Sequence, residues 1–245
     1  MRRVFLSGAL AAEMEITGDD AHHLMRVLRC KIGDTLTVAD AQRQAAEAEI
    51  VGCTARSVQL RLVRKLAADA EPPVRVALAQ CLLKADKMDW IVQKAVELGA
   101  DRIYPVASEN CVVRYDAEKC AARRLKWQKI AMEAAKQCGR DAVPVVEAVR
   151  PLVALLEDTR DARQLFCYER EDALGLKAAL RDEDAASYLL LIGPEGGFSP
   201  QEAALCQRFG AAAVSLGPRI LRAETAALAA LSAVLYEKGD LGGKK

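Results

Sequence analysis

The chain has 245 residues, of which 52% are hydrophobic and 28% charged, and its formal net charge is +1. This composition can bury a sizeable core and excludes an intrinsically disordered chain. The length slightly favours two domains over one. No apolar run approaches the roughly 20 residues that a membrane-spanning helix requires, so no membrane partner is expected.

Eight cysteines are scattered along the chain without any C-x-x-C pair. This spacing indicates neither a zinc site nor a thioredoxin-like motif, so we expect structural thiols and no metal. Scattered free thiols are typical of a reducing compartment, which predicts a cytoplasmic protein. The short apolar run after Arg2-Arg3 is similar to a signal peptide, but a first β-strand and its turn explain it as well.

The first part of the chain, residues 1–70, reads as a small β-barrel domain. Apolar and polar residues alternate over 35–38, 48–51 and 57–63, as they do in half-buried strands. One helix is expected over 20–29, with Asp19 or Asp20 as its N-cap. Short strands at this spacing favour a barrel.

The predicted helix over 20–29 carries His22, Arg26 and Arg29, which an α-helix would place on one face. One interpretation is a basic patch that binds RNA phosphates through Arg26 and Arg29. The alternative is an ordinary solvated helix face. The two adjacent histidines, without a third ligand, do not indicate a metal site.

A second domain is expected over 73–238, after a small, polar, proline-terminated linker at 67–73. Strands and helices then alternate, which indicates a mainly parallel sheet with helices on both faces. The tail 239–245 is expected to be disordered. Strands are predicted at 74–82, 102–106, 143–146, 164–167 and 189–192, with a short run at 214–217, and helices at 86–98, 119–137, 152–156, 173–181, 200–209 and from about 224.

The helix over 119–137 is strongly basic. Between Lys119 and Arg140 there are seven basic residues and one acid, Glu133, with Trp127 among them. A basic helix with an aromatic residue is typical of a nucleic-acid surface, although a solvated face is again the alternative. The predicted RNA contacts in this region are Arg123, Arg124, Lys126 and Arg140.

Two glycine loops near the C-terminus predict a ligand site. The first follows the apolar strand 189–192 and spans 193–198, and the second follows 214–217; each leads into a helix. In α/β sheets, ligands bind beyond the carboxyl ends of the strands, and glycines there allow close approach of the backbone. The predicted binding residues are Ile192, Gly193, Pro194, Glu195, Gly196, Gly197, Leu216, Gly217, Ile220, Leu221, Arg222 and Thr225.

The loops lack the motifs of common nucleotide sites. Neither G-x-G-x-x-G nor the phosphate-binding G-x-x-x-x-G-K-[ST] occurs. Glu195 would repel a pyrophosphate but suits a cationic ligand with a ribose and an adenine, such as S-adenosylmethionine. Leu216, Ile220 and Leu221 could enclose the adenine. A plain strand–turn–helix junction is the alternative.

The two loop sequences, LIGPEGGFS at 191–199 and LGPRILRAETA at 216–226, resemble those of the RsmE family. These proteins are 16S ribosomal RNA uridine-N3 methyltransferases of the SPOUT class. HHLMRVLR at 22–29, KMDWIVQKAVELG at 87–99 and EAAKQCGR at 133–140 resemble further family motifs. Ala41, where glycine is expected, and Ala223, where threonine is common, depart from the family pattern without touching the chemistry.

This resemblance implies a SPOUT-type parallel-sheet methyltransferase domain with a C-terminal trefoil knot, preceded by a PUA-like β-barrel. It also implies S-adenosylmethionine as cofactor, a homodimer with the active site between subunits, and 16S rRNA or the small ribosomal subunit as substrate. Glu195 and Glu224 are then candidate bases for the N3 proton, and Arg222 a candidate stabiliser of the uracil anion. For Glu224, a helix N-terminal carboxylate stabilised by the helix dipole is the alternative.

Two other functional classes stay open at this point. One is an RNA-binding protein without activity, against which the intact glycines and the RAET sequence at 222–225 argue. The other is a small-molecule α/β enzyme with a different nucleotide cofactor, against which the missing phosphate motifs argue.

Overall fold

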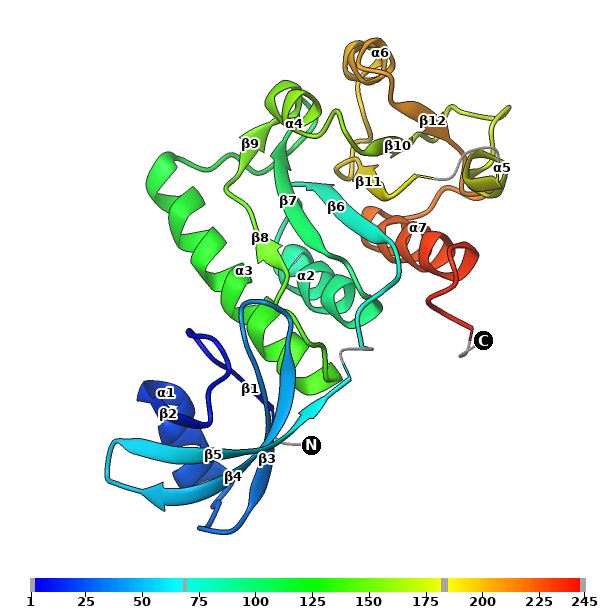
Figure 1. Cartoon of the computed structure of the whole chain (residues 1–245). Helices are drawn as coiled ribbons and strands as arrows, with labels where there is room; N and C mark the ends of the chain where they lie inside the picture. The colour runs from blue at the N-terminus through cyan, green and yellow to red at the C-terminus, as the bar shows by residue number, and fades with distance from the viewer. Residues whose placement is uncertain (1–2, 68–69, 182–184, 243–245) are drawn as a thin grey trace. The chain divides into compact units, whose positions relative to one another are not determined.

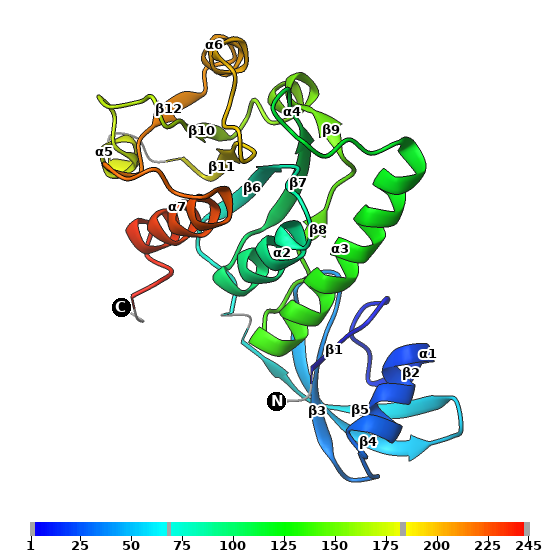
Figure 2. The same cartoon turned by 180° about the vertical axis from the view of Figure 1, so that it is seen from behind.

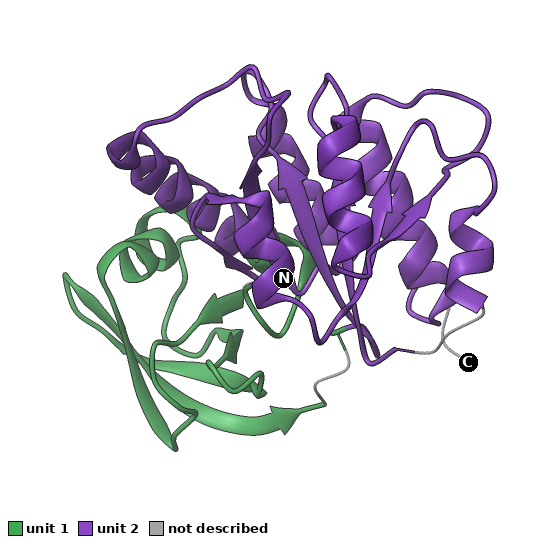
Figure 3. Ribbon diagram, turned by 90° about the horizontal axis from the view of Figure 1, so that it is seen from above, with its two compact units in different colours: residues 1–71, 135–143 green, residues 72–134, 144–245 purple. Residues whose placement is uncertain are grey.

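The computed structural model describes residues 3–67, 70–181 and 185–242, and these divide into two compact units. Unit 1 comprises residues 1–71 together with 135–143, and unit 2 comprises 72–134 and 144–245 (Figure 3). Residues 68–69 of the expected linker and 243–245 of the expected tail lie outside the described part. Residues 239–242, expected to be disordered, form turns in which the Asp240 and Leu241 N–H groups donate to the Leu235 carbonyl.

Unit 1 is built on a five-stranded sheet with the order β1-β3-β4-β5-β2 (Figure 1). Neighbouring strands in this sheet are antiparallel, except that β1 and β3 are parallel. The inward side chains, among them Val38, Ile50 and Leu60, are fully buried, as the sequence alternation predicts. Among the described residues, β1 and β2 form the two edges of this sheet, so its pairing does not close into a barrel. Its strands are β1 (Arg3–Phe5), β2 (Glu13–Thr17), β3 (Thr35–Ala39), β4 (Ala45–Cys53) and β5 (Ser57–Leu66).

The helix predicted over 20–29 begins and ends two residues earlier. It consists of α1 (Gly18–His22) followed by one π-helical turn, η1 (His23–Val27). Thr17 is the N-cap, so Asp19 and Asp20 lie in the first turn instead of capping it. The Leu28 N–H donates to the His23 carbonyl five residues back, which is the hydrogen-bond spacing of a π-helix.

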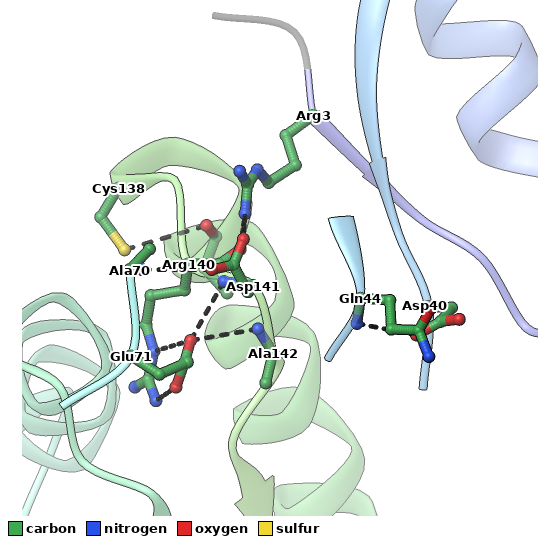
Figure 4. A network of polar contacts seen from close by, with 10 residues as sticks. Arg3, Asp40, Gln44, Ala70, Glu71, Cys138, Arg140, Asp141 and Ala142 are labelled. Atoms are coloured by element: carbon green, nitrogen blue, oxygen red, sulfur yellow. Dashed lines mark hydrogen bonds and ion pairs between the residues drawn. The ribbon is translucent and has the colours of Figure 1, made fainter. Parts of the chain in front are cut away.

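The polar network in Figure 4 holds the segment 135–143 in unit 1. The Glu71 carboxylate accepts hydrogen bonds from the Arg140 guanidinium and from the N–H groups of Asp141 and Ala142. The Asp141 carboxylate in turn accepts from Arg3 at 2.7 Å and from the Ala70 N–H at 3.1 Å. Buried charges need such partners, since an unpaired buried charge is costly.

Unit 2 contains a seven-stranded sheet in which all described pairings are parallel. The strand order is β12-β10-β11-β6-β7-β8, with β9 also paired to β7. β8 lies at the edge, as its proline-flanked sequence predicts. The strands are β6 (Arg75–Cys81), β7 (Arg102–Ala107), β8 (Val145–Val146), β9 (Arg150–Pro151), β10 (Arg163–Cys167), β11 (Ser187–Ile192) and β12 (Ala212–Val214).

The helices of unit 2 pack on this sheet and on each other. α7 contacts α2 as well as β6 and β11, and α2 and α7 lie side by side in Figures 1 and 2. α4 packs against β7, and α6 against β12. The helices are α2 (Lys87–Leu98), α3 (Ala117–Cys138), α4 (Leu152–Asp158), α5 (Leu176–Arg181), α6 (Pro200–Arg208) and α7 (Ala223–Glu237); the last residues of α3 belong to unit 1.

Candidate active site

A cavity of about 940 Å³ lies at the carboxyl ends of β10, β11 and β12. These three strands are neighbours in the sheet, so the loops that follow them gather at one edge. The loops are 168–172, 193–197 and 215–222. Every residue predicted to bind the cofactor lines this cavity except Thr225, which is exposed.

The loop 193–197 comes close to its neighbours because it is rich in glycine. A Cβ at Gly193 would lie 3.3 Å from the backbone of Gly197. Gly197 has a φ of +67°, and a Cβ there would lie 2.7 Å from Glu169 Oε1. The Asn110 amide donates to the carbonyls of Gly196 and Gly197, at 3.3 and 3.1 Å. These contacts fix the backbone path along one wall of the cavity.

A capping box anchors the far end of this loop at the start of α6. The Ser199 side chain accepts from the Glu202 N–H at 3.1 Å, and the Glu202 carboxylate accepts from the Ser199 N–H at 3.0 Å. Pro200 follows as the first helical residue, where its missing N–H costs nothing. The second Glu202 oxygen accepts from the Glu109 N–H at 2.8 Å, so one buried carboxylate joins two loops.

The loop 215–222 ends at α7. Arg222 is the N-cap of this helix and provides no side-chain cap. Glu224 lies in the first turn, which agrees with its dipole-stabilised interpretation. However, Glu224 also lines the cavity, and its Oε2 atom has no hydrogen-bond partner in the described part of the chain. Ile220, at 87% exposure, is an open apolar side chain on the cavity loop.

Sequence reasoning missed Lys87, the first residue of α2. Its Nζ atom lies 3.2 Å from Glu195 Oε1 and 3.4 Å from Glu224 Oε2, so it contacts both candidate bases. Lys87 follows β6, the sheet neighbour of β11, and this adjacency is the feature that could have pointed to it. Burial alone would lower the pKa of Lys87, but the two carboxylates outweigh burial, and the pKa is raised.

The loop 168–172 was also missed. It contributes Glu169, Glu171 and Asp172 to the cavity. The signal was present, because this loop follows the predicted strand 164–167 at the same end of the sheet. With Glu195 and Glu224, the cavity has five acidic side chains, against three basic ones, Lys87, Arg219 and Arg222. The excess of acidic groups favours a cationic ligand.

Glu195 is ionised and well satisfied. Burial raises the pKa of its carboxyl, but the N–H groups of Glu195 and Lys84 and the Lys87 ammonium lower it more, and the net pKa lies below the usual value. Lys84 N–H donates to Glu195 Oε1 at 3.3 Å. A lowered pKa makes Glu195 a weak candidate for taking a proton from a substrate.

The predicted basic surface is partly occupied by internal contacts. Lys126 pairs with Asp89 at 2.5 Å, and Arg124 donates to the Val146 carbonyl at 3.1 Å. Trp127 is buried and donates to Asp89, so it is a core residue instead of an exposed stacking platform. Arg123 lies over the ring of Tyr115, 5.7 Å from its centroid.

The expectation that His22, Arg26 and Arg29 share one helical face is wrong. The π-turn changes the angular spacing, and Arg29 follows the helix with a left-handed φ of 52°. Arg26 and Arg29 are nevertheless both exposed. Arg140 is 4% exposed and ion-paired with Glu71 at 2.5 Å, so its predicted RNA contact disagrees with its position (Figure 4). The number of basic residues in the sequence does not reveal the ion pair between Arg140 and Glu71.

Two family models match the chain. An RNA methyltransferase domain matches residues 70–235, and an RNA methyltransferase PUA domain matches residues 16–63. The ribosomal RNA small subunit methyltransferase E of Bacillus subtilis is 34% identical over 239 residues, which cover 95% of this chain and 93% of that protein.

The chain belongs to the ribosomal RNA small subunit methyltransferase E family.

Further similar proteins also match most of the chain. The Mycobacterium tuberculosis protein of this name is 30% identical, covering 93% of this chain and 87% of its own. The structure of the Neisseria gonorrhoeae family member, bound to S-adenosyl methionine, matches with a TM-score of 0.85 at 32% identity and covers 95% and 96% of the two chains. A Legionella pneumophila methyltransferase, in complex with the same cofactor, matches with a TM-score of 0.85 at 31% identity, covering 96% of each chain.

Family membership confirms the resemblance drawn from the loop sequences, the RNA methyltransferase class and the PUA-like N-terminal domain. Within the described residues, no helix is long and apolar enough to cross a membrane, and no group of three or more metal-ligating side chains occurs.

Proposed function

We propose that this protein transfers a methyl group from S-adenosylmethionine to N3 of one uridine in the decoding region of 16S rRNA. The acidic cavity of about 940 Å³ at the carboxyl ends of β10, β11 and β12 carries the proposal. It has the position that α/β folds use for ligands and the charge that a sulfonium cofactor requires. The N3 position and the decoding region rest on the resemblance to the family.

The residues of the cavity fit this cofactor. The Gly193 backbone approaches Gly197 so closely that an added Cβ would lie 3.3 Å from it, and both residues line the cavity. The Glu224 carboxylate lines the cavity, and a carboxylate can accept a hydrogen bond from a hydroxyl or amino group. The half-buried Leu216 and Leu221 give the cavity an apolar wall suited to an adenine. Ile192, Gly193 and Gly196 also line it and would hold the cofactor together with these groups.

The bound cofactor would supply an electrophilic methyl group, and the protein must orient uracil N3 and manage its proton. Glu195 is unsuited to accept that proton because its pKa is lowered. Glu224 is the better candidate, since its Oε2 atom has no hydrogen bond in the described chain and contacts Lys87 through an ion pair at 3.4 Å. Arg222 is exposed beside it and is proposed to stabilise the uracil anion.

The proposed RNA contacts are the exposed or partly exposed basic residues of each unit: Arg26 and Arg29 in unit 1, and Arg123, Arg124 and Lys126 in unit 2. Phosphate contacts release counterions, so affinity for RNA should fall steeply between about 50 and 200 mM salt. If the binding constant barely changes over this range of salt, these residues do not contact RNA phosphates. The target uridine must leave its stack to reach the cavity.

We also propose the SPOUT arrangement, in which the C-terminal segment forms a trefoil knot. After β12 pairs with β10, the chain returns to pack α7 on β6, β11 and α2, which supports a crossing of the segments around the cavity. A crystal structure with bound S-adenosylmethionine, traced through residues 160–237, tests this. The domains proposed from the sequence, 1–70 and 73–238, would then bind RNA and transfer the methyl group.

A cytoplasmic homodimer with the active site between subunits completes the proposal. Ile220, exposed on the cavity loop, is an apolar side chain that a second copy would cover. Sedimentation velocity of the wild-type protein and of Ile220→Glu tests it: the wild type should sediment as a dimer and the variant as a monomer. A wild-type protein that sediments as a monomer would contradict the proposed homodimer.

Two measurements test the function as a whole. Calorimetry should show binding of S-adenosylmethionine by the purified protein. The absence of binding would contradict the proposed methyltransferase function. Mass mapping of rRNA from a deletion strain should show one uridine without its methyl group. Binding of RNA without cofactor binding would instead indicate a protein that has lost its activity.

A further inference from the structure

The Lys87 side chain contacts two segments of the cavity, the loop 193–197 and the start of α7 after the loop 215–222. Its side chain comes from α2, outside both loops, and it lines the cavity. The same Nζ atom pairs with Glu195 in the loop 193–197 and with Glu224 at the start of α7, at 3.2 and 3.4 Å. The three side chains are 31%, 28% and 19% exposed, so the contact is partly shielded from water.

The two carboxylates would repel each other without this cation. Both oxygens lie within 3.4 Å of one atom, so they are close neighbours. Two carboxylates that share a site favour uptake of a proton by one of them. Glu195 has other partners, the Lys84 N–H among them. Glu224 Oε2 has no hydrogen bond in the described chain and relies on the charge of Lys87.

We infer that Lys87 is a positioning residue of the cofactor site, whose ammonium bridges Glu195 and Glu224 and so holds the loop 193–197 to the start of α7. This inference rests on the proposed function, because the loops are taken to be those of a methyltransferase. The bridge offsets the repulsion between the two carboxylates and joins two walls of the cavity. The cavity is thereby organised before a ligand enters, which lowers the cost of binding.

The test compares Lys87→Met with the wild type by calorimetry with S-adenosylmethionine between about pH 5 and 8. We expect about tenfold weaker binding at the upper end of this range, since a charged contact that organises the site is lost. The loss should shrink toward the acidic end, because protonation of one carboxylate relieves the repulsion. Lys87→Arg, which keeps a cation, should bind nearly as the wild type does.

Lys94→Met is the matched control. Lys94 lies on the same helix, is 34% exposed, and pairs with Glu97 at 2.8 Å away from the cavity. It should leave binding unchanged. Equal binding by Lys87→Met and Lys94→Met overturns the inference.

Titration of the ligand-free protein separates this inference from the proposed function. With ¹³C-labelled glutamate, NMR should show one carboxyl pKa rising in Lys87→Met and none rising in Lys94→Met. If the wild type binds no S-adenosylmethionine but this shift appears, the cofactor assignment fails and the bridge stands. If the cofactor binds and no carboxyl pKa moves, the bridge fails and the proposed function stands.

Discussion

The hydrogen bonds of individual side chains distinguish the two candidate bases of the site. Glu195 and Glu224 look equivalent in the sequence, because both are acids that follow a glycine loop or open a helix. In the structure Glu195 accepts hydrogen bonds from Lys84 and Lys87, whereas Glu224 Oε2 accepts none in the described chain. Of the two candidate bases, Glu224 is therefore the one to test in catalysis.

Glu224→Gln should lower the rate of methyl transfer about 10²–10⁴-fold if Glu224 is the base, because this is the usual contribution of a positioned base. Binding of S-adenosylmethionine should fall much less, since the amide still accepts a hydrogen bond. Single-turnover transfer to small-subunit RNA measures the rate, and calorimetry measures the binding. A variant that methylates at the wild-type rate removes Glu224 from this role.

The lowered pKa of Glu195 predicts a pH dependence of stability. A carboxyl whose pKa is lower in the folded state stabilises the fold above its unfolded pKa, and this stabilisation is lost as the pH falls through the folded pKa. Glu195→Gln should therefore have a lower melting temperature than the wild type at neutral pH, with the gap closing below about pH 4. Thermal unfolding monitored by circular dichroism checks this. A gap that is constant with pH contradicts the contribution of Glu195 charge.

At the scale of elements, short contacts at the ends of helices and strands shape the cavity. The loop 193–197 is held by its own glycines, by Asn110 and by the capping box that starts α6. The sequence of the box, Ser199 followed by Glu202, predicts the start of this helix. It does not predict the hydrogen bond from the Glu109 N–H to Glu202, which arises because β7 ends nearby.

Gly197→Ala should weaken cofactor binding as well as stability. A Cβ there meets Glu169 Oε1 at 2.7 Å, and the positive φ adds strain of about 1 kcal/mol. Gly210→Ala is the control, because Gly210 has a φ of +86° and nothing within 4 Å of the added atom. Both variants should lose stability in urea, but only Gly197→Ala should lose affinity for S-adenosylmethionine. Equal affinities contradict the role of this close approach.

Ser199→Ala should lower the free energy of unfolding by about 1 kcal/mol, the usual cost of losing a helix N-cap. The measurement is equilibrium unfolding in urea. Ser187→Ala in β11 serves as a comparison that removes a hydroxyl outside any cap, and it should change stability less. No difference between the two contradicts the contribution of the capping box.

At the scale of the whole molecule, the division into units does not follow the chain order. A boundary between 70 and 73 suits the sequence, but residues 135–143 return to unit 1. The interaction that holds them there centres on Glu71, which accepts from the side chain of Arg140 and from two backbone N–H groups (Figure 4). A fragment that begins at residue 73 would lack Glu71 and leave Arg140 without this partner.

Glu71→Ala should destabilise the protein by about 3 kcal/mol, because it leaves a buried arginine without its carboxylate. Glu47→Ala is the control: Glu47 pairs with Arg64 on the surface of the same unit, where an ion pair contributes about 1 kcal/mol or less. Denaturant unfolding of both variants measures the difference. Similar losses would contradict the structural role of the Glu71 network.

The sequence by itself determined the alternation of strands and helices, the strand–loop–helix order of the site and the two glycine loops that line the cavity. These follow from local patterns: apolar runs, glycines after strands and helix-cap residues. The motifs also carried the family resemblance. Only the tertiary structure revealed Lys87, the loop 168–172 and the burial of Arg140. Their roles depend on contacts between segments far apart in the chain, and no local pattern encodes which distant carboxylate a lysine or arginine will meet.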